Sequence, residues 1–158
     1  MYSAQQFKLV SSYGDFFHQW AWDHYATFTF ARQQSHLNCL RHWSEFIESL
    51  GRTTRGRVGW VRADEQRSSG CGTSAIPLHF HALLKYRNVS PAEAVAALWK
   101  AEAGVAKVED YHSGGGAAFY LAKMLPYEGA GYGMGGLEYF PRSEDSPIRS
   151  RVQWLRKT

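Results

Sequence analysis

Alternating and helically spaced apolar residues divide the first half of the chain into four expected elements. Residues 23–31 alternate polar with β-branched and aromatic side chains, which predicts a strand. Ser35 is a suitable N-cap for a helix in which apolar residues recur at helical spacing from Leu37 to Leu50, and Gly51 is expected to end it. Residues 58–66 and 76–86 predict two strands, joined by a Gly/Ser-rich segment at 68–72 that is typical of an antiparallel hairpin.

The second half continues with a helix, a strand and another helix. Ser90-Pro91-Ala92-Glu93 combines an N-cap, a proline at the first helical position and an acid at the capping-box position, so a helix is expected up to residue 103, ended by Gly104. Residues 105–111 predict a fourth strand, and residues 117–125 a helix that Pro126 closes. The first fifteen residues lack a clear period and are interpreted as an extension. Residues 127–158 are interpreted as an irregular, glycine-rich tail with a short helix at 149–158.

This order of elements predicts an α+β fold, an antiparallel sheet with helices packed largely on one face. A chain of 158 residues fits one domain, 1–158, with its core at about 20–126. Neither a membrane-spanning stretch nor a signal-peptide pattern is found. The two cysteines, Cys39 and Cys71, form no CxxC motif. A reduced cytoplasmic protein is therefore expected, with a single disulfide between the two cysteines as the alternative.

Charge adds a candidate partner. The net charge is +4 and the pI is about 9.1, with most cations being arginine. The planar guanidinium group suits phosphate oxygens, and six tryptophans are available to stack on bases. The composition favours a nucleic-acid partner, and a solvated basic face is the alternative.

Two histidines on one expected strand are the first candidates for chemistry. In Pro77-Leu78-His79-Phe80-His81, residues two apart point to the same face of the sheet, so His79 and His81 project together and Phe80 turns into the core. Two imidazoles at that spacing can bind one divalent ion. Isolated HxH pairs also occur as structural histidines, so a further ligand must converge on the same face.

Glu65 is the candidate for that third ligand. It lies near the end of the preceding strand, in phase with Val61 and Ala63, and the hairpin would bring it opposite the histidines. Asp64, one residue away on the other face, is the competitor. Two histidines and one carboxylate leave positions open for water and substrate, and this mixed donor set accepts Mn²⁺ or Mg²⁺ as well as zinc.

The helix expected at 117–125 carries a possible nucleophile in Tyr120-Leu121-Ala122-Lys123. Positions i and i+3 share a helix face, so Tyr120 and Lys123 can reach one site. A nearby lysine or metal ion would favour the phenolate over the phenol and neutralise charge on an attacked phosphate. The alternative is an amphipathic helix with an exposed tyrosine and lysine.

Together, Thr27-Phe28-Thr29-Phe30, Glu65 before His79-Phe80-His81, and Tyr120 with Lys123 resemble the three motifs of HUH endonucleases. Their order and spacing are similar to those of the rolling-circle replication initiator (Rep) nicking domain. The resemblance covers residues 24–125. Met124 stands where two-tyrosine members carry their second tyrosine, which indicates the single-tyrosine type. Tyr111 and Tyr127 are decoys without a lysine at i+3.

The resemblance implies a ferredoxin-like Rep/HUH sandwich, a central antiparallel sheet with flanking helices. His79, His81 and Glu65 would bind Mn²⁺ or Mg²⁺, Tyr120 would attack DNA to form a 5′-phosphotyrosine link, and Lys123 would assist. The implied partner is single-stranded DNA at a hairpin-flanked replication origin of a plasmid or phage, with host helicase and polymerase also involved. Residues near the hairpin expected to contact DNA are Arg62, Arg67, Lys85 and Arg87 for the backbone, Trp60 or Tyr86 for a base, and Thr29 on the sheet floor.

Two rival functions share these residues. A single-tyrosine HUH transposase would use the same site, usually with the tyrosine donated across a dimer. A non-enzymatic nucleic-acid-binding module would use the sheet aromatics for stacking and give the histidines and Tyr120 no chemical role.

Overall fold

A computed structural model describes residues 4–67, 76–124 and 131–143. Within these residues the helices are α1 (Ala4–Phe17), α2 (His36–Thr53), α3 (Ala92–Glu102) and α4 (Ala117–Met124). The strands are β1 (His24–Phe30), β2 (Val58–Arg67), β3 (Ile76–Tyr86), β4 (Gly104–Asp110) and β5 (Tyr132–Gly135). Short 3₁₀ turns lie at Ser113–Gly115 and Leu137–Tyr139. The fold is α+β, as predicted.

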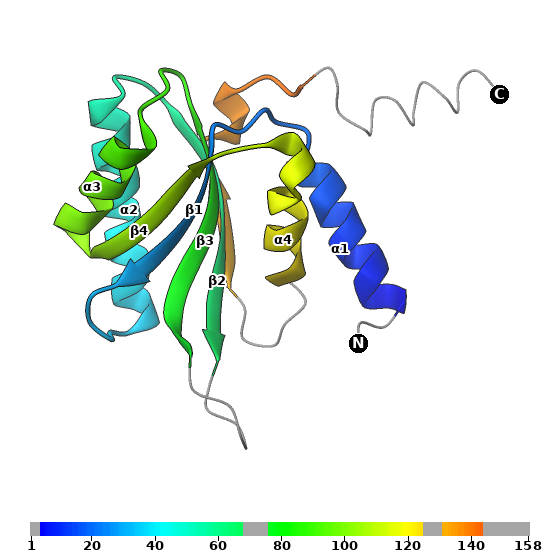
Figure 1. Cartoon of the computed structure of the whole chain (residues 1–158), viewed down its shortest axis with the longest axis horizontal. Helices are drawn as coiled ribbons and strands as arrows, with labels where there is room; N and C mark the ends of the chain where they lie inside the picture. The colour runs from blue at the N-terminus through cyan, green and yellow to red at the C-terminus, as the bar shows by residue number, and fades with distance from the viewer. Residues whose placement is uncertain (1–3, 68–75, 125–130, 144–158) are drawn as a thin grey trace.

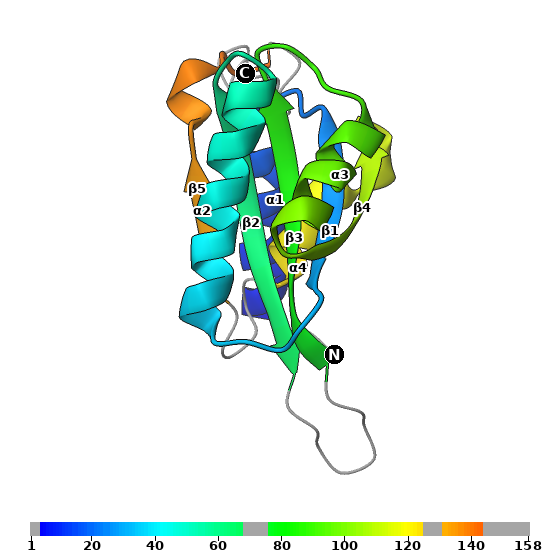
Figure 2. The same ribbon diagram turned by 90° about the vertical axis from the view of Figure 1, so that its left-hand side faces the viewer.

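The described strands form one antiparallel sheet in the order β4-β1-β3-β2-β5. Its first four strands, together with α2 and α3, give the β-α-β-β-α-β order of ferredoxin-like folds. The remaining elements, α1, α4 and β5, are additions to that unit, and β5 extends the sheet beside β2 (Figure 2). The predicted hairpin of β2 and β3 is confirmed, while the connection at 68–72 lies outside the described residues.

Helices cover both faces of the sheet, not largely one. Figure 1 shows α2 and α3 on one side and α1 and α4 on the other. Each pair closes its own buried cluster. On the α2/α3 side Phe28 and Phe80 pack against Trp43 and Trp99, and on the α1/α4 side Val61 and Leu83 pack beneath α4. The second layer was not expected because α1 had been interpreted as an extension.

Several element ends differ from the sequence expectation for local reasons. Ser35 caps α2 as predicted, its hydroxyl accepting a hydrogen bond from the Asn38 amide, but the helix continues past Gly51 to Thr53. The N-cap of α3 is Pro91, without a side-chain hydrogen bond, so the capping box is wrong. Helix α3 ends at Glu102, and Gly104 is already the first residue of β4.

The ends of the described chain are more ordered than expected. Residues 4–17 form α1, and residues 132–135, placed in an irregular tail, form β5. The short helix expected at 149–158 and the last residue of the expected 117–125 helix lie outside the described residues. Among the helices that the structure describes, none is long and apolar enough to cross a membrane.

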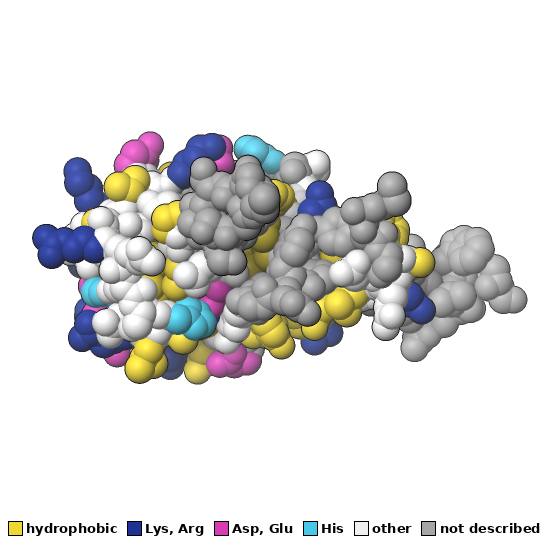
Figure 3. Space-filling view, turned by 90° about the horizontal axis from the view of Figure 1, so that it is seen from below, with side chains coloured by type: hydrophobic (Ala, Val, Ile, Leu, Met, Phe, Trp, Pro, Cys, Tyr) yellow, Lys and Arg dark blue, Asp and Glu magenta, His cyan; other side chains and the backbone are white. Residues whose placement is uncertain are grey.

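In Figure 1 the lower ends of β2 and β3 form a part of this sheet face that extends beyond α4. The side chains on that part come from the alternating positions Thr27 and Thr29 of β1, His79 and His81 of β3, and Glu65 of β2. Viewed from below, histidine, acidic and basic side chains are scattered over the surface of the molecule (Figure 3).

Candidate functional site: a histidine–glutamate cluster beside Tyr120

The β2–β3 register brings the three predicted metal ligands together. Glu65 pairs with His79, and Ala63 pairs with His81, so the glutamate and both histidines point to the same face. Asp64 lies on the opposite face, where its carboxylate contacts Arg62 and His36. The alternation along β2 therefore selects Glu65 over Asp64.

Both imidazoles converge on one carboxylate oxygen. The Nε2 atoms of His79 and His81 lie 3.0 and 3.1 Å from Glu65 Oε2, and all three side chains are at least mostly buried. These three residues can place one ligand atom each within 4.8 Å of one another. The cluster is thus assembled without any rearrangement of the fold.

The other ring nitrogens are held by neighbours that set the orientation of the imidazoles. His79 Nδ1 lies 3.0 Å from the Pro77 carbonyl oxygen, which can only accept, so this nitrogen must donate. His81 Nδ1 lies 3.0 Å from the Tyr25 hydroxyl and 3.2 Å from the Thr27 hydroxyl. Such outer partners are the usual means of fixing a metal-binding histidine.

These contacts call for a positive charge between the ligands. Because His79 donates through Nδ1, a neutral His79 would direct the Nε2 lone pair at the anionic Glu65 oxygen. A proton on His79 or a metal ion removes that repulsion. Adjacent ligand atoms around an octahedral ion with bonds of ~2.1 Å lie about 3.0 Å apart, so the two observed separations, which are also those of ordinary hydrogen bonds, bring the ligand atoms close enough to share one ion. The donor set therefore fits a divalent cation.

The environment of His81 favours the neutral form that a metal requires. Burial lowers the pKa of His81, and the nearby His79 lowers it further, against the opposing effect of the Glu65 carboxylate. A neutral imidazole keeps the Nε2 lone pair available for a cation.

Tyr120 stands next to this cluster. Its ring centroid lies 5.4 Å from that of His81 and 6.3 Å from that of Tyr25, both in edge-to-face arrangements. Tyr120 is 42% exposed, so an incoming ligand can reach it. The predicted nucleophile thus shares one site with the predicted metal ligands, of which the two histidines are about forty residues away in sequence and Glu65 is further.

Local packing fixes α4 in this position. Gly116, at a φ of +72°, provides the left-handed turn before the helix, and its carbonyl accepts the amide hydrogen bond of Tyr120. Leu121 and Ala122 are buried beneath the helix. The Phe119 ring lies so close to Gly14 of α1 that a Cβ there would overlap it. Helix α1 therefore helps to hold Tyr120 over the sheet.

The other tyrosines are less suited to attack. Burial raises the pKa of Tyr25 to about 12, and the charges of Tyr120, Glu109 and Glu65 add to the shift. Burial also raises the pKa of Tyr111, whose hydroxyl lies 3.4 Å from His18 Nδ1, away from the cluster. Tyr127 lies outside the described residues. Lys123 is exposed one turn after Tyr120 on α4.

Most of the predicted DNA contacts do not lie at this site. Arg62 is only 6% exposed and forms a buried ion pair with Asp64, with its guanidinium 4.6 Å from the Phe80 ring centroid. Trp60, which lies on the same face of β2 as Arg62, packs against Trp43 beneath α2. Both were expected to face DNA and are instead on the opposite side of the sheet from Glu65. The predicted stacking residue Tyr86 is also buried.

The remaining predicted cations are far from the cluster or not described. Lys85 is six residues beyond His79 along β3, about 20 Å at ~3.3 Å per residue, and is paired with Asp23. Arg87 is exposed just beyond that far end of β3. The side chain of Arg67 lies outside the described part of the chain. Only Thr29, exposed and paired with His79, lies beside the cluster.

Sequence reasoning missed the outer partners of the cluster. Tyr25 was assigned only to a strand, and Thr27 only to the first of the three motifs, although both share a face of β1 with Thr29. The same period-two pattern that grouped His79 with His81 would have placed these hydroxyls opposite the histidines, once the pairing of β1 with β3 was known.

A second set of metal-type ligands lies on the other side of the sheet. His42 and Glu45 of α2 and Glu102 of α3 place their ligand atoms within 4.8 Å of one another. His42 Nδ1 is 2.6 Å from Glu102 and 3.9 Å from Glu45. Because the charge of Arg41 also favours the ionised form of Glu102, this set is best described as a helix–helix ion-pair network.

Comparison of the chain with protein-family models, with curated proteins and with solved structures found no match.

Proposed function

We propose that this protein is a metal-dependent endonuclease that nicks and rejoins single-stranded DNA through a phosphotyrosine at Tyr120, as an initiator of rolling-circle replication. The observation that carries the proposal is the contact of Tyr120 with His81, within a cluster whose third member is the predicted Glu65. A structural histidine pair has no need of an accessible tyrosine beside it.

One feature favours replication initiation over transposition. Tyr120 and the histidine cluster belong to the same chain and are already in contact. A transposase of the related group usually receives its tyrosine from a partner subunit, so a complete site within one chain is the arrangement expected of a nicking initiator.

The residues can be given definite roles in this reaction. Tyr120 Oη would attack the scissile phosphorus and release its proton to solvent, forming the tyrosine–phosphorus bond while the bond from phosphorus to the 3′ oxygen breaks. The 3′ oxygen would take a proton and leave as a hydroxyl, with Lys123 offsetting the charge that develops on the phosphate. Attack of a 3′-hydroxyl on the phosphotyrosine would reverse the step and join strands without ATP.

Glu65, His79 and His81 would hold a divalent cation, for which Mn²⁺ or Mg²⁺ is our proposal from the mixed donor set. Such an ion supplies Lewis-acid polarisation of a phosphate oxygen. Tyr25, Thr27 and the Pro77 carbonyl would keep the two rings in the geometry that the ligands need. In this proposal the chain acts in the cytoplasm, on single-stranded DNA at a replication origin, alongside host helicase and polymerase.

A cleavage assay on an end-labelled pool of single-stranded DNA tests the proposal. With Mn²⁺ the protein should release fragments that carry a free 3′-hydroxyl, and EDTA should abolish the release. Tyr120→Phe should reduce nicking by about 10³-fold or more, because the nucleophile is lost. Tyr111→Phe is the matched control and should nick normally.

Full nicking by Tyr120→Phe would refute the role of Tyr120. Binding of single-stranded DNA that is insensitive to EDTA, with no nicking under any metal condition, would instead support the binding module.

A further inference from the structure

A basic groove lies at the same end of the sheet as the histidine cluster. It has a volume of about 520 Å³ and is bordered by Arg32, His42, Lys100 and Glu102, with residues 103–105 along its floor. This volume is within the range of small-ligand sites. A neighbouring cavity near Cys39 and Leu78 has only about 30 Å³, room for little more than water.

Strands β1 and β4 approach each other closely beside the groove. A Cβ on Gly104 would overlap the Thr29 carbonyl oxygen and the Phe30 Cα. The Ala31 amide donates to the Ala103 carbonyl, which carries the pairing past the end of β1. Arg32 borders the groove from the segment between β1 and α2.

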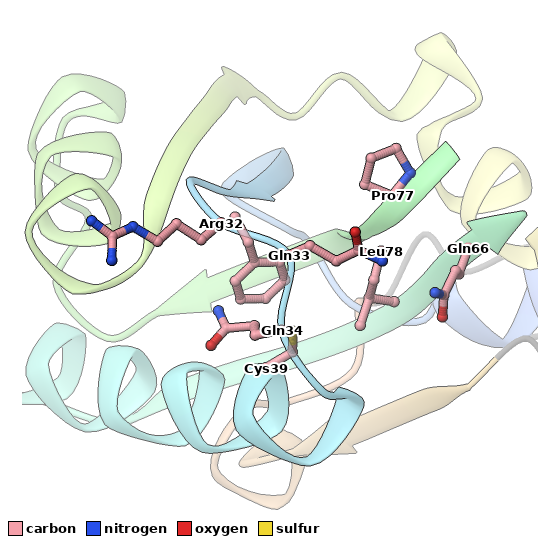
Figure 4. Close-up of a pocket in the computed structure, with 8 residues that line it drawn as sticks. Arg32, Gln33, Gln34, Cys39, Gln66, Pro77 and Leu78 are labelled. Atoms are coloured by element: carbon pink, nitrogen blue, oxygen red, sulfur yellow. The ribbon is translucent and has the colours of Figure 1, made fainter. Parts of the chain in front are cut away.

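The charges in the groove favour an anion. The Glu102 carboxylate lies 2.6 Å from His42 Nδ1, and the positive charge of Arg41 also stabilises it. Arg32 and Lys100 are exposed, and among the residues that the structure describes no carboxylate lies within ion-pair distance of either. Figure 4 shows Arg32 extending toward α3, away from Gln66, Pro77 and Leu78. In Figure 3, lysine and arginine side chains gather on the side of the molecule that carries α2 and α3.

A row of paired residues connects the groove to the histidine cluster. Val105 at the groove floor pairs with Thr29, Thr29 pairs with His79, and His79 pairs with Glu65. Neighbouring strands lie about 4.8 Å apart, so Val105 is about 10 Å from His79 across the sheet. Thr29 and Val105 are both exposed, so this row has an open surface.

We propose that this groove binds the phosphodiester backbone of the single-stranded DNA on one side of the scissile phosphate, with Arg32 and Lys100 as its phosphate contacts. The inference rests on the proposed nicking function and names where its substrate lies. The strand would leave the cluster over Thr29 and Val105 and bend around the end of β4 into the groove. At ~3.4 Å per nucleotide along a stacked strand, about 10 Å corresponds to about three nucleotides, less than the ~4–16 that single-strand-binding folds cover.

This assignment replaces the cations chosen from the sequence. Arg62 is buried, Lys85 is paired with Asp23, and Arg87 lies at the far end of β3. Arg87 therefore provides a matched control, because it is exposed and carries the same charge as Arg32.

The test is the affinity of the full chain for a fluorescently labelled, mixed-sequence single strand, measured by anisotropy over a range of salt concentrations. All proteins carry Tyr120→Phe and the buffer contains EDTA, so that cleavage does not interfere. Arg32→Gln and Lys100→Gln should each raise Kd about tenfold and lower the slope of log Kd against log salt by about 0.7. Arg87→Gln should change neither quantity, and thermal unfolding should confirm that every variant is folded.

Unchanged Kd and salt slope in Arg32→Gln and Lys100→Gln, or an equal loss in Arg87→Gln, would overturn the groove while leaving the nicking proposal intact. A parent protein that binds no single-stranded DNA would contradict the proposed function itself, and with it the premise of the groove.

Discussion

The hydroxyl groups of Tyr25 and Thr27 contact the His81 imidazole at Nδ1, the nitrogen that does not face Glu65. Removing both hydroxyls should therefore weaken metal binding without changing any metal ligand. The Tyr25 and Thr27 hydroxyls lie 3.0 and 3.2 Å from His81 Nδ1. Hydroxyl groups can donate to or accept from this nitrogen, so they hold the ring whichever nitrogen carries the proton. The double variant Tyr25→Phe/Thr27→Val removes both contacts and keeps the shapes of the side chains.

The size of the effect on metal affinity follows from the fact that two hydroxyls contact the same nitrogen. Loss of an outer partner of a metal ligand typically lowers metal affinity 10–100-fold, equivalent to about 1.4–2.7 kcal/mol. Either hydroxyl alone can still orient the ring, so each single variant should lose less than about tenfold, and the double variant should show the full loss. The two effects should therefore combine more than additively, as expected of groups that share one partner.

Calorimetric titration with Mn²⁺ measures this effect directly. Glu65→Gln supplies the baseline for a disabled cluster, and Tyr111→Phe removes a tyrosine hydroxyl from a position outside it. A double variant that binds Mn²⁺ as tightly as the unaltered protein would refute the idea that these hydroxyls position a metal ligand.

Three further predictions concern stability. Asp64→Asn leaves the buried Arg62 without its carboxylate partner and should cost about 3–5 kcal/mol in urea unfolding; a loss below about 1 kcal/mol would contradict the buried ion pair. Gly104→Ala should destabilise by about 1–3 kcal/mol in the same assay, because its methyl group overlaps the Thr29 carbonyl oxygen, and a neutral effect would contradict the close approach of β1 and β4. Burial opposes ionisation of Glu102, but hydrogen bonds with His42 and Glu45 leave its pKa below its ordinary 4.5. The ionised carboxylate therefore stabilises the fold above that pH, and this contribution is lost as the pH falls further. The difference in unfolding free energy between the unaltered protein and Glu102→Gln should shrink on acidification, and a pH-independent difference would refute this linkage.

The period-two pattern was sufficient to predict the core of the site. Val61, Ala63 and Glu65 were expected on one face of β2, and the hairpin register places Glu65 opposite His79 as predicted. Strand alternation is set by backbone geometry, so it can be predicted without knowledge of the rest of the fold. The contact of Tyr120 with His81, by contrast, depends on how α4 packs against α1 and the sheet, which the pattern does not specify.

The same pattern, followed consistently, argues against Arg62 as a DNA contact. Arg62 is out of phase with Glu65, and the structure places it beneath α2, beside the rings of Trp43 and Phe80. Charge indicates a surface position only on average, because a paired arginine can be buried among aromatic rings.

The elements missed at the two ends have different physical causes. In α1 the exposed Phe7 and Leu9 obscure the helical period that Val10 and Phe17 would otherwise show. In β5, Gly133 and Gly135 lie against the Trp60 ring, where a Cβ would be within 3.1 Å of it. This strand is therefore favoured by its packing rather than by β-propensity, and its sequence alone indicates a loop.

The most direct test of the account is to locate the covalent link between protein and DNA. The protein is incubated with Mn²⁺ and a single-stranded DNA pool, trapped, digested and analysed by peptide mass spectrometry. The account predicts a nucleotide attached through a 5′ phosphate to Tyr120, absent in EDTA and absent in His81→Ala. A metal-dependent adduct on another residue would contradict the assignment of Tyr120. The absence of any adduct on DNA that the protein nicks would contradict the phosphotyrosine mechanism.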